Sequence, residues 1–241
     1  MWKFDATFSG IIQQTSDVKT FRFDVGDKKG VTYRAGQFFY VTIKVGEEEA
    51  EHHFTLSSAP TETAEKGYIE FTKRITASPY SQALDRKKVG DWARVWGPEG
   101  DFVLPKGTKN LAFLSGGIGI TPLRSMLRYI ADKGLHHNVV LIYANNSYDN
   151  IAFRQELDEI GAKNDRIRVE YVLSGQGTPP GWKGKLGFIT KELVSKLVPD
   201  AKERLFYLSG PLKMVLSLEE QLAMLGIPAE QVKRDYFPGY D

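Results

Sequence analysis

The first 105 residues alternate apolar and polar positions in short runs. Residues 20–25 (TFRFDV) and 40–45 (YVTIKV) show the alternation expected of half-buried strands, and glycine-containing turns separate such runs. Further strands are expected at residues 6–13, 54–57, 68–74 and 93–97. About six short strands with little helix predict a closed antiparallel β-barrel of the Greek-key type, because closure leaves no open strand edge.

The pattern changes after residue 106. Apolar strands are expected at residues 110–115, 139–144, 167–173 and 205–209, with helices between them near 123–130, 153–160, 191–197 and 212–225. Gly226 is placed to end the last helix, and residues 231–237 close the chain. Strands that alternate with helices predict a parallel-sheet α/β domain of the Rossmann-like type. We therefore expect two domains, at residues 1–106 and 107–241.

Composition removes several classes of function. The 32 basic residues nearly balance the 30 acidic ones, so the sequence offers no clustered charge for nucleic acid. Cysteine is absent, which excludes disulfides, iron–sulfur clusters and a thiol nucleophile. The histidines form adjacent pairs, His52-His53 and His136-His137, so no metal site is expected. No apolar run has the length of a membrane span and no signal peptide is evident, so we expect a cytoplasmic protein.

Two turns are candidates for binding a nucleotide. Residues 114–122 (LSGGIGITP) lie between an expected strand and an expected helix, where glycines allow a diphosphate to approach the backbone. Thr121 is expected to cap that helix and Pro122 to lie in its first turn. Ser209-Gly210-Pro211 forms a second strand-to-helix turn, and a dinucleotide at the carboxyl edge of one sheet can touch both. The alternative is that each is an ordinary strand-to-helix turn.

The order of several motifs resembles the ferredoxin–NADP reductase superfamily over essentially the whole chain. Besides the two turns, these are residues 143–146 (YANN), 153–157 (FRQEL) and 182–189 (WKGKLGFI). The resemblance implies a flavin-binding barrel followed by an NAD(P)-binding domain. It also implies that NADH or NADPH passes a hydride to bound FAD, with FMN as the alternative flavin. The nucleotide contacts that it implies are Gly116, Gly117, Gly119, Thr121, Pro122, Asn145, Gly210 and Pro211.

Residues 52–60 (HHFTLSSAP) stand where this superfamily has its R-x-Y-S/T flavin motif. The motif positions are filled by His52, Phe54 and Thr55, a variant that resembles the H-P-F-T form of NADPH oxidase and ferric reductase flavin domains. By that resemblance, His52 faces the flavin diphosphate, Phe54 packs on the isoalloxazine and Thr55 lies near its reactive nitrogen. The alternative is a plain buried strand, with Phe54 and Leu56 in the core and both histidines exposed.

A second flavin-binding element is expected after the next strand. Residues 71–74 (FTKR) resemble the V-K-R strand end of the family, and residues 78–84 (SPYSQAL) resemble its G-x-x-S-x-x-L helix start, with Ser78 in place of glycine. The resemblance implies that Thr72, Lys73, Ser78 and Ser81 lie near the flavin diphosphate. Alternatively, Lys73 and Arg74 are ordinary surface charges.

The catalytic candidates are Thr55, Ser209 and Phe237. Ser209 stands where many relatives carry a cysteine beside the nicotinamide, and Phe237 best matches the terminal aromatic residue of the family, with Tyr240 as second choice. The alternative for Phe237 is a packing residue in a frayed tail. Asn145, Asn146, Ser174, Gly175 and Gln176 follow the second and third α/β strands without a cation, which favours NADH.

The electron acceptor is expected to be a separate protein, such as ferredoxin, flavodoxin or a haem protein, because the sequence has no cysteines for an iron–sulfur cluster and no haem domain. Two other functions fit the same fold. One is a free-flavin or ferric reductase, and the other is a non-catalytic subunit that senses nucleotides.

Overall fold

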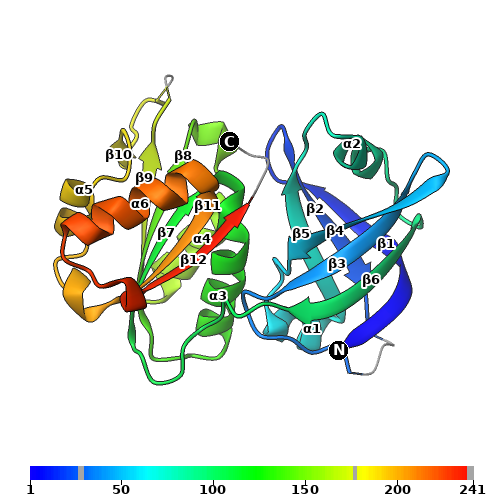
Figure 1. Ribbon diagram of the computed structural model, residues 1–241, viewed down its shortest axis with the longest axis horizontal. Helices are drawn as coiled ribbons and strands as arrows, with labels where there is room; N and C mark the ends of the chain where they lie inside the picture. Colours follow the sequence, from blue (N-terminus) through cyan, green and yellow to red (C-terminus); the bar gives the residue numbers. More distant parts are fainter. Residues whose placement is uncertain (27–29, 176–177, 238–241) are drawn as a thin grey trace. The chain divides into compact units, whose positions relative to one another are not determined.

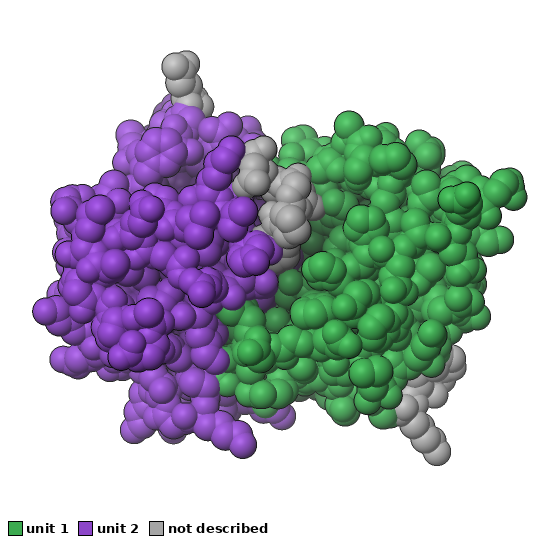
Figure 2. Space-filling view, viewed as in Figure 1, with its two compact units in different colours: residues 1–104, 124–129 green, residues 105–123, 130–241 purple. Residues whose placement is uncertain are grey.

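The computed structural model describes residues 1–26, 30–175 and 178–237. The chain forms two compact units, which Figure 2 shows in separate colours. Unit 1 contains Met1–Leu104 and Arg124–Tyr129, and unit 2 contains Pro105–Leu123 and Ile130–Asp241. Residues 124–129 are the middle of one helix whose two ends belong to unit 2. In the described residues, no helix is both long enough and apolar enough to cross a membrane.

Unit 1 is an antiparallel sheet with strand order β4-β3-β6-β1-β2-β5 (Figure 1). Its long first strand serves two partners, because residues 2–7 pair with β6 and residues 8–13 pair with β2, with a bulge between Phe8 and Gly10. Beyond the end of β4, the Ser57 N–H donates to the Glu70 carbonyl of β5 at 2.8 Å, which joins the outer strands of the sheet. Its elements are β1 (Trp2–Gln13), β2 (Val18–Asp24), β3 (Phe38–Val45), β4 (Glu48–Thr55), α1 (Pro60–Lys66), β5 (Tyr68–Arg74), α2 (Pro79–Asp85) and β6 (Trp92–Glu99).

Aromatic side chains fill the interior of unit 1. Phe8, Phe21, Phe23, Phe39 and Phe71 are fully buried, and neighbouring rings lie 4.8 to 6.4 Å apart between centroids. They come from alternate positions of their strands, as the sequence pattern predicts for strands with one buried face. This core supports the strands that carry the flavin motif.

One strand prediction in unit 1 is wrong. The sequence predicts a strand at residues 54–57, whereas β4 spans Glu48–Thr55. Three of residues 48–51 (EEAE) are charged, as suits β4 at the edge of its sheet, where most of its side chains face solvent. An edge strand needs little apolar alternation, so the sequence pattern does not reveal it.

Unit 2 is a parallel sheet with strand order β10-β9-β8-β7-β11-β12. Helices α5 and α6 pack on one face of it through a cluster of buried residues that includes Leu114, Phe206 and Leu218 (Figure 1). Gly226 ends α6 with a φ of 71°, as predicted. The elements are β7 (Asn110–Gly116), α3 (Ile120–Asp132), β8 (Asn138–Asn145), α4 (Arg154–Lys163), β9 (Ile167–Leu173), β10 (Lys185–Leu186), α5 (Lys191–Leu197), β11 (Leu205–Pro211), α6 (Leu212–Met224) and β12 (Val232–Phe237).

The strand order of unit 2 indicates where a ligand would bind. From β7 the chain proceeds through β8 to β9 in one direction across the sheet, whereas β11 lies on the other side of β7. A crevice forms at the carboxyl ends of the strands where such an order reverses, and ligands of open parallel sheets bind there. The Gly117–Gly119 turn follows β7, whereas Ser209–Pro211, predicted as a turn, forms the end of β11, so the two predicted nucleotide segments meet at this point.

Candidate functional site

The two glycine turns of unit 2 lie directly against each other. A Cβ atom on Gly119 would come within 2.4 Å of the Ser209 carbonyl oxygen and 2.5 Å of the Gly210 nitrogen. A Cβ atom on Gly116 would come within 2.1 Å of the Met214 sulfur. Glycine is therefore required here for the contact between the turns, besides any contact with a diphosphate.

The first turn is held by its neighbours. Gly117 has a φ of 52°, a conformation that favours glycine, and the Tyr143 hydroxyl of β8 donates to the Gly117 carbonyl at 2.9 Å. The prediction that Thr121 caps the helix is wrong, because a 3₁₀ turn over Gly117–Gly119 leads into α3 at Ile120. Thr121 lies inside the helix, and its hydroxyl donates to the Ile118 carbonyl at 3.2 Å. Pro122 lies in the first helical turn, as predicted.

Three buried polar side chains stand at the carboxyl ends of adjacent strands without partners. In the part of the chain that the structure describes, the hydroxyls of Ser115 and Ser209 and both amide atoms of Asn145 make no hydrogen bond. Ser115 and Ser209 are 0% exposed and Asn145 is 5% exposed. Buried polar atoms are normally completed by protein, by ordered water or by a ligand, and three of them at the carboxyl edge of a parallel sheet stand where ligands bind. A nicotinamide nucleotide, rich in donors and acceptors, fits this requirement.

Ser115 was not among the residues singled out from the sequence. It pairs in register with Ser209 on the neighbouring strand β11, so the two side chains lie on the same face of the sheet. A polar residue at the end of an otherwise apolar strand is the sequence signal that marks it.

The Ser209–Pro211 segment at the end of β11 pairs with β12. Gly210 pairs with Tyr236 and Pro211 with Phe237, which places the backbone of Phe237 beside the Ser209-Gly210-Pro211 turn. Phe237 thus ends a paired strand, in contrast to the alternative of a frayed tail. Tyr240 and Gln176, also considered from the sequence, lie outside the described residues.

In unit 1, the flavin motif occupies the end of β4. The Phe54 ring is half-buried and stacks on Phe71 with centroids 4.5 Å apart, so one face is fixed against the core. The exposed His52 ring contacts Tyr80 at 4.2 Å. Partial burial, followed by the nearby Lys73 charge, lowers the pKa of His52. Thr55 is buried at the end of the strand, 6% exposed.

Lys73 is not an ordinary surface charge. Its side chain on β5 is 9% exposed, and burial lowers its pKa to about 8. Lys73 lies close enough to His52 to lower the pKa of that imidazole, and a cation beside the flavin motif suits an anionic phosphate. Arg74, at the end of the same strand, forms an ion pair with Asp17 at 3.3 Å and remains partly exposed.

The three hydroxyl residues predicted to contact the flavin diphosphate all have internal partners. Thr72 lies in a buried chain of hydroxyls, 2.8 Å from Thr20 and 3.0 Å from Ser57. Ser78 caps α2, because its hydroxyl accepts from the Ser81 N–H at 3.3 Å, and the Ser81 hydroxyl accepts from the Thr76 N–H at 2.8 Å. Serine in place of glycine therefore has a local structural role, and a diphosphate would compete with it.

Glu62, which follows the flavin motif closely in sequence, forms a buried ion pair with Arg124. Glu62 of α1 accepts hydrogen bonds from both terminal nitrogens of Arg124 and from the Ala59 N–H. Burial alone would raise the pKa of Glu62, but Arg124, Ala59 and Lys66 together hold it below its usual range. The carboxylate is therefore charged at neutral pH.

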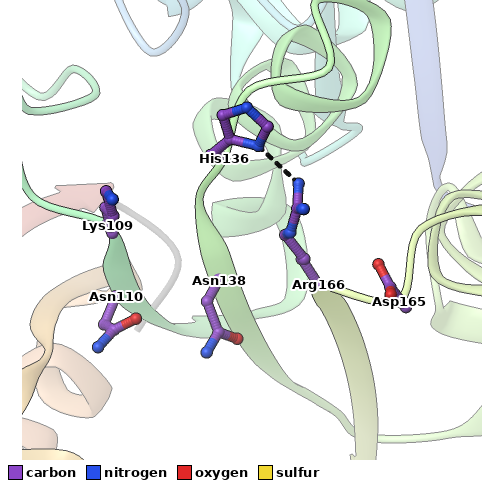
Figure 3. A pocket seen from close by; sticks show the side chains of 6 residues that line it. All are labelled: Lys109, Asn110, His136, Asn138, Asp165 and Arg166. Carbon is purple, nitrogen blue, oxygen red and sulfur yellow. Dashed lines mark hydrogen bonds between the residues drawn. The ribbon is translucent and has the colours of Figure 1, made fainter.

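A separate pocket lies at the opposite, amino-terminal ends of β7, β8 and β9 (Figure 3). It encloses 460 Å³, and Arg166 reaches toward His136, with 2.8 Å between a guanidinium nitrogen and Nδ1. Ligands of parallel sheets bind at the carboxyl ends of the strands, so this pocket lies on the wrong edge for a nucleotide. It contains none of the site residues predicted from the sequence. Its lining residues are Lys109, Asn110, His136, Asn138, Asp165 and Arg166.

Two family models match the chain, one on each half. The oxidoreductase FAD-binding domain matches residues 6–104, and the oxidoreductase NAD-binding domain matches residues 113–220. The residues described above fit these groups, with a half-buried ring and a buried cation in the first domain and unpartnered polar atoms in the second.

Similar proteins are reductases. The NADH-cytochrome b5 reductase 1 of Cryptococcus neoformans var. neoformans is 31% identical over 206 residues, which are 80% of this chain and 68% of that protein. The glycine betaine monooxygenase reductase subunit of Pseudomonas aeruginosa is 26% identical over 229 residues, or 94% of this chain. The chain spans 62% of the length of that bacterial subunit.

Solved structures share the whole two-domain fold. The flavohem-like FAD/NAD binding domain of nitric oxide dioxygenase from Vibrio cholerae has a TM-score of 0.86 at 19% identity, with 97% of this chain and 98% of that chain covered. A ferredoxin NADP+ reductase from Neisseria gonorrhoeae, with bound FAD and NADP, has a TM-score of 0.82 at 18% identity, with 97% and 98% covered. From its two domain matches, its fold and its fungal relative, the chain belongs to the ferredoxin–NADP reductase superfamily.

Proposed function

We propose that this protein is an NAD(P)H-dependent flavoprotein reductase that passes electrons from NAD(P)H, through FAD, to a separate acceptor protein. The observation that carries the proposal is the set of three unpartnered buried side chains, Ser115, Asn145 and Ser209, at the switch point of the parallel sheet. When bound, FAD supplies the chemistry that accepts a hydride and releases electrons singly or in pairs. The flavin-binding and nucleotide-binding domains are proposed as residues 1–106 and 107–241.

The residues of unit 2 bind and orient the nucleotide. Backbone groups of the turn at Gly116, Gly117 and Gly119 face the diphosphate, and Tyr143 keeps that turn in place. Asn145 and Ser209 supply the hydrogen bonds that their own fold leaves unmade. Thr121, Pro122, Gly210 and Pro211 shape the two turns, and Phe237 lies beside the second of them.

The residues of unit 1 hold the flavin. Lys73 provides positive charge and His52 a hydrogen bond for the diphosphate, assisted by Ser81 and the backbone at Ser78 and by the strand that carries Thr72. Phe54 offers its accessible side to the isoalloxazine, since its other face rests on Phe71. Thr55 places a hydroxyl at the end of the same strand, where it orients the bound ring.

A separate protein as electron acceptor is supported by the names of two relatives, a reductase subunit of a monooxygenase and a cytochrome b5 reductase. Ferredoxin, flavodoxin and haem proteins are the classes that we propose. NADH is the proposed donor, because the residues at the carboxyl ends of β8 and β9 (Asn145, Asn146, Ser174 and Gly175) carry no cation for a 2′-phosphate.

A steady-state assay tests this function. The FAD-loaded protein should oxidise NADH with a one-electron acceptor such as ferricyanide, with NADPH as the poorer donor. A strong kinetic preference for NADPH would overturn the proposed donor. Absence of turnover with both nucleotides would instead favour the non-catalytic, nucleotide-sensing alternative.

A free-flavin or ferric reductase is the second candidate. It is favoured by one observation. The Ser78 hydroxyl already accepts a hydrogen bond from the Ser81 N–H, which a tightly bound diphosphate would need. Weak retention of FAD on gel filtration, with turnover that rises with added riboflavin, would support it. Tight retention and no response to riboflavin would support the separate protein acceptor.

The variant Ser209→Ala should slow flavin reduction by about 2- to 10-fold, the effect of one lost hydrogen bond to the nucleotide. Without nucleotide its thermal stability should be unchanged or higher, because the hydroxyl that it removes has no partner. Stopped-flow reduction and thermal melts measure the two effects. The exposed Ser217→Ala on α6 is the control. An unchanged single-turnover rate would remove Ser209 from the site.

FAD affinity should fall as the pH rises above about 8. Binding an anionic diphosphate favours the charged form of Lys73, whose pKa of about 8 in the free protein means that it loses its proton above that pH. The binding constant should then decline by at most about tenfold per pH unit. Fluorescence titration with FAD between neutral and alkaline pH measures it. A flat profile would show that Lys73 does not contact the diphosphate.

A further inference from the structure

The Glu62–Arg124 ion pair of unit 1 is almost fully buried, and its two side chains bond at two points. The side chains of Glu62 and Arg124 are 4% and 7% exposed, and the two carboxylate oxygens meet the two terminal guanidinium nitrogens. One of these contacts, from Arg124 Nη2 to Glu62 Oε1, measures 3.1 Å. Two-point contact of this kind fixes the orientation of both groups as well as their separation.

The pair also bonds to the backbone that follows β4. Arg124 Nη1 donates to the Ser57 carbonyl at 2.8 Å, and Glu62 accepts from the Ala59 N–H at 2.9 Å. The neighbouring Ser125 hydroxyl donates to the Ser58 carbonyl at 2.7 Å. Three consecutive residues are thus held by side chains from α1 and from residues 124–125. This segment begins two residues after Thr55, the last residue of β4.

Stability alone does not explain the arrangement. Burying two charges removes their hydration, and well-packed apolar residues of similar volume generally give a fold at least as stable. What the apolar residues cannot supply is a set of directed hydrogen bonds to Ser57 and Ala59. The pair therefore restricts the position of the backbone, whatever it contributes to stability.

We propose that Glu62 and Arg124 are positioning residues that fix segment 57–59, and through it Thr55 and Phe54, for binding the flavin. This inference rests on the proposed function for its catalytic consequence, because Thr55 and Phe54 are the proposed flavin contacts. It goes beyond that function in assigning a role to two residues that do not belong to the flavin motif.

The test replaces the pair by apolar residues of similar size, Glu62→Leu with Arg124→Met. This double variant avoids leaving one charge buried alone, so it should fold where either single variant fails. Hydrogen exchange at the Ala59 N–H, followed in the peptide containing residues 56–60, should be at least about tenfold faster than in the original protein, since that N–H loses the Glu62 carboxylate. Loss of the same directed bonds should slow anaerobic flavin reduction at saturating NADH by at least about tenfold.

The control is another ion pair of this unit, between Arg22 and Glu70, whose side chains bond to each other at 2.7 to 2.8 Å. Glu70 bonds to Ser57 and Ser58 through its backbone, which the substitution keeps. Arg22→Met with Glu70→Leu should leave exchange of that peptide unchanged. Unchanged exchange in the Glu62→Leu/Arg124→Met variant would overturn the positioning role, whether or not the protein is an active reductase. Faster exchange with an unchanged rate of flavin reduction would show that Glu62 and Arg124 have a structural role only. Failure of the original protein to be reduced by either nucleotide would instead contradict the proposed function, and the exchange result would still decide the positioning role.

Discussion

Gly119→Ala should raise the KM for NADH by about 100-fold or more, the size of effect that follows when binding groups move by about 1 Å. The new Cβ atom would lie 2.4 to 2.5 Å from backbone atoms of Ser209 and Gly210, whereas ordinary contacts begin at 3.4 Å. Backbone cannot rotate away as a flexible side chain does. The two turns must therefore separate, and the nucleotide loses contacts on both.

Gly161→Ala is the matched control for this variant. Gly161 also belongs to unit 2, but it lies within α4, and its added Cβ atom would be 3.5 Å from Val169 Cγ2. This substitution should leave the KM for NADH unchanged and stabilise the protein by about 0.4–1 kcal/mol. Steady-state kinetics measure both variants, with bound flavin quantified separately. A normal KM in Gly119→Ala would show that contact between the turns is not needed for nucleotide binding.

Lys73→Met should weaken FAD binding by about 10- to 100-fold, since a hydrogen bond to a charged group contributes about 1.5–3 kcal/mol. The free protein should lose little stability, because methionine keeps the buried aliphatic stem of the lysine and removes a charge whose burial lowers its pKa. Loss of cofactor without loss of stability separates a binding residue from a packing residue. FAD titration by fluorescence and thermal melts of the flavin-free protein measure the two quantities.

Lys44→Met, on the exposed side of β3, is the control for Lys73→Met. It removes a solvent-exposed lysine from another strand of the same sheet. Neither the FAD affinity nor the melting temperature should therefore change appreciably. The Lys73→Met variant should also lose the fall in affinity above pH 8. Normal FAD affinity in Lys73→Met would remove this residue from the flavin site.

Much of the fold is predictable from local pattern. The predicted bounds of β5, β9 and α5 agree with the structure, because their apolar periodicity is strong. Helix α1 was not predicted, since Pro60–Lys66 is short and polar and its capping carboxylate, Glu62, also pairs with a distant arginine. β4 was misplaced because an edge strand has little apolar alternation to reveal it.

The candidate site likewise has parts that the sequence predicts and parts that only the folded structure reveals. The glycine turns are visible in sequence because the positions of their glycines are local constraints. The burial of Lys73 and the partnership of Glu62 with Arg124 depend on residues far apart in the chain, 62 positions for that pair, so no local pattern contains them. Ser115 is intermediate, because its position at a strand end is local but its lack of a partner is a property of the folded sheet.

The central claim is that NADH reduces a flavin held by this chain. Anaerobic titration of the FAD-loaded protein with NADH and then NADPH, followed by visible flavin absorbance, tests it most directly. We predict that stoichiometric NADH bleaches the flavin and that NADPH does so more slowly. A flavin that remains oxidised with both nucleotides would contradict the claim and indicate a member of the superfamily that binds nucleotides without transferring electrons.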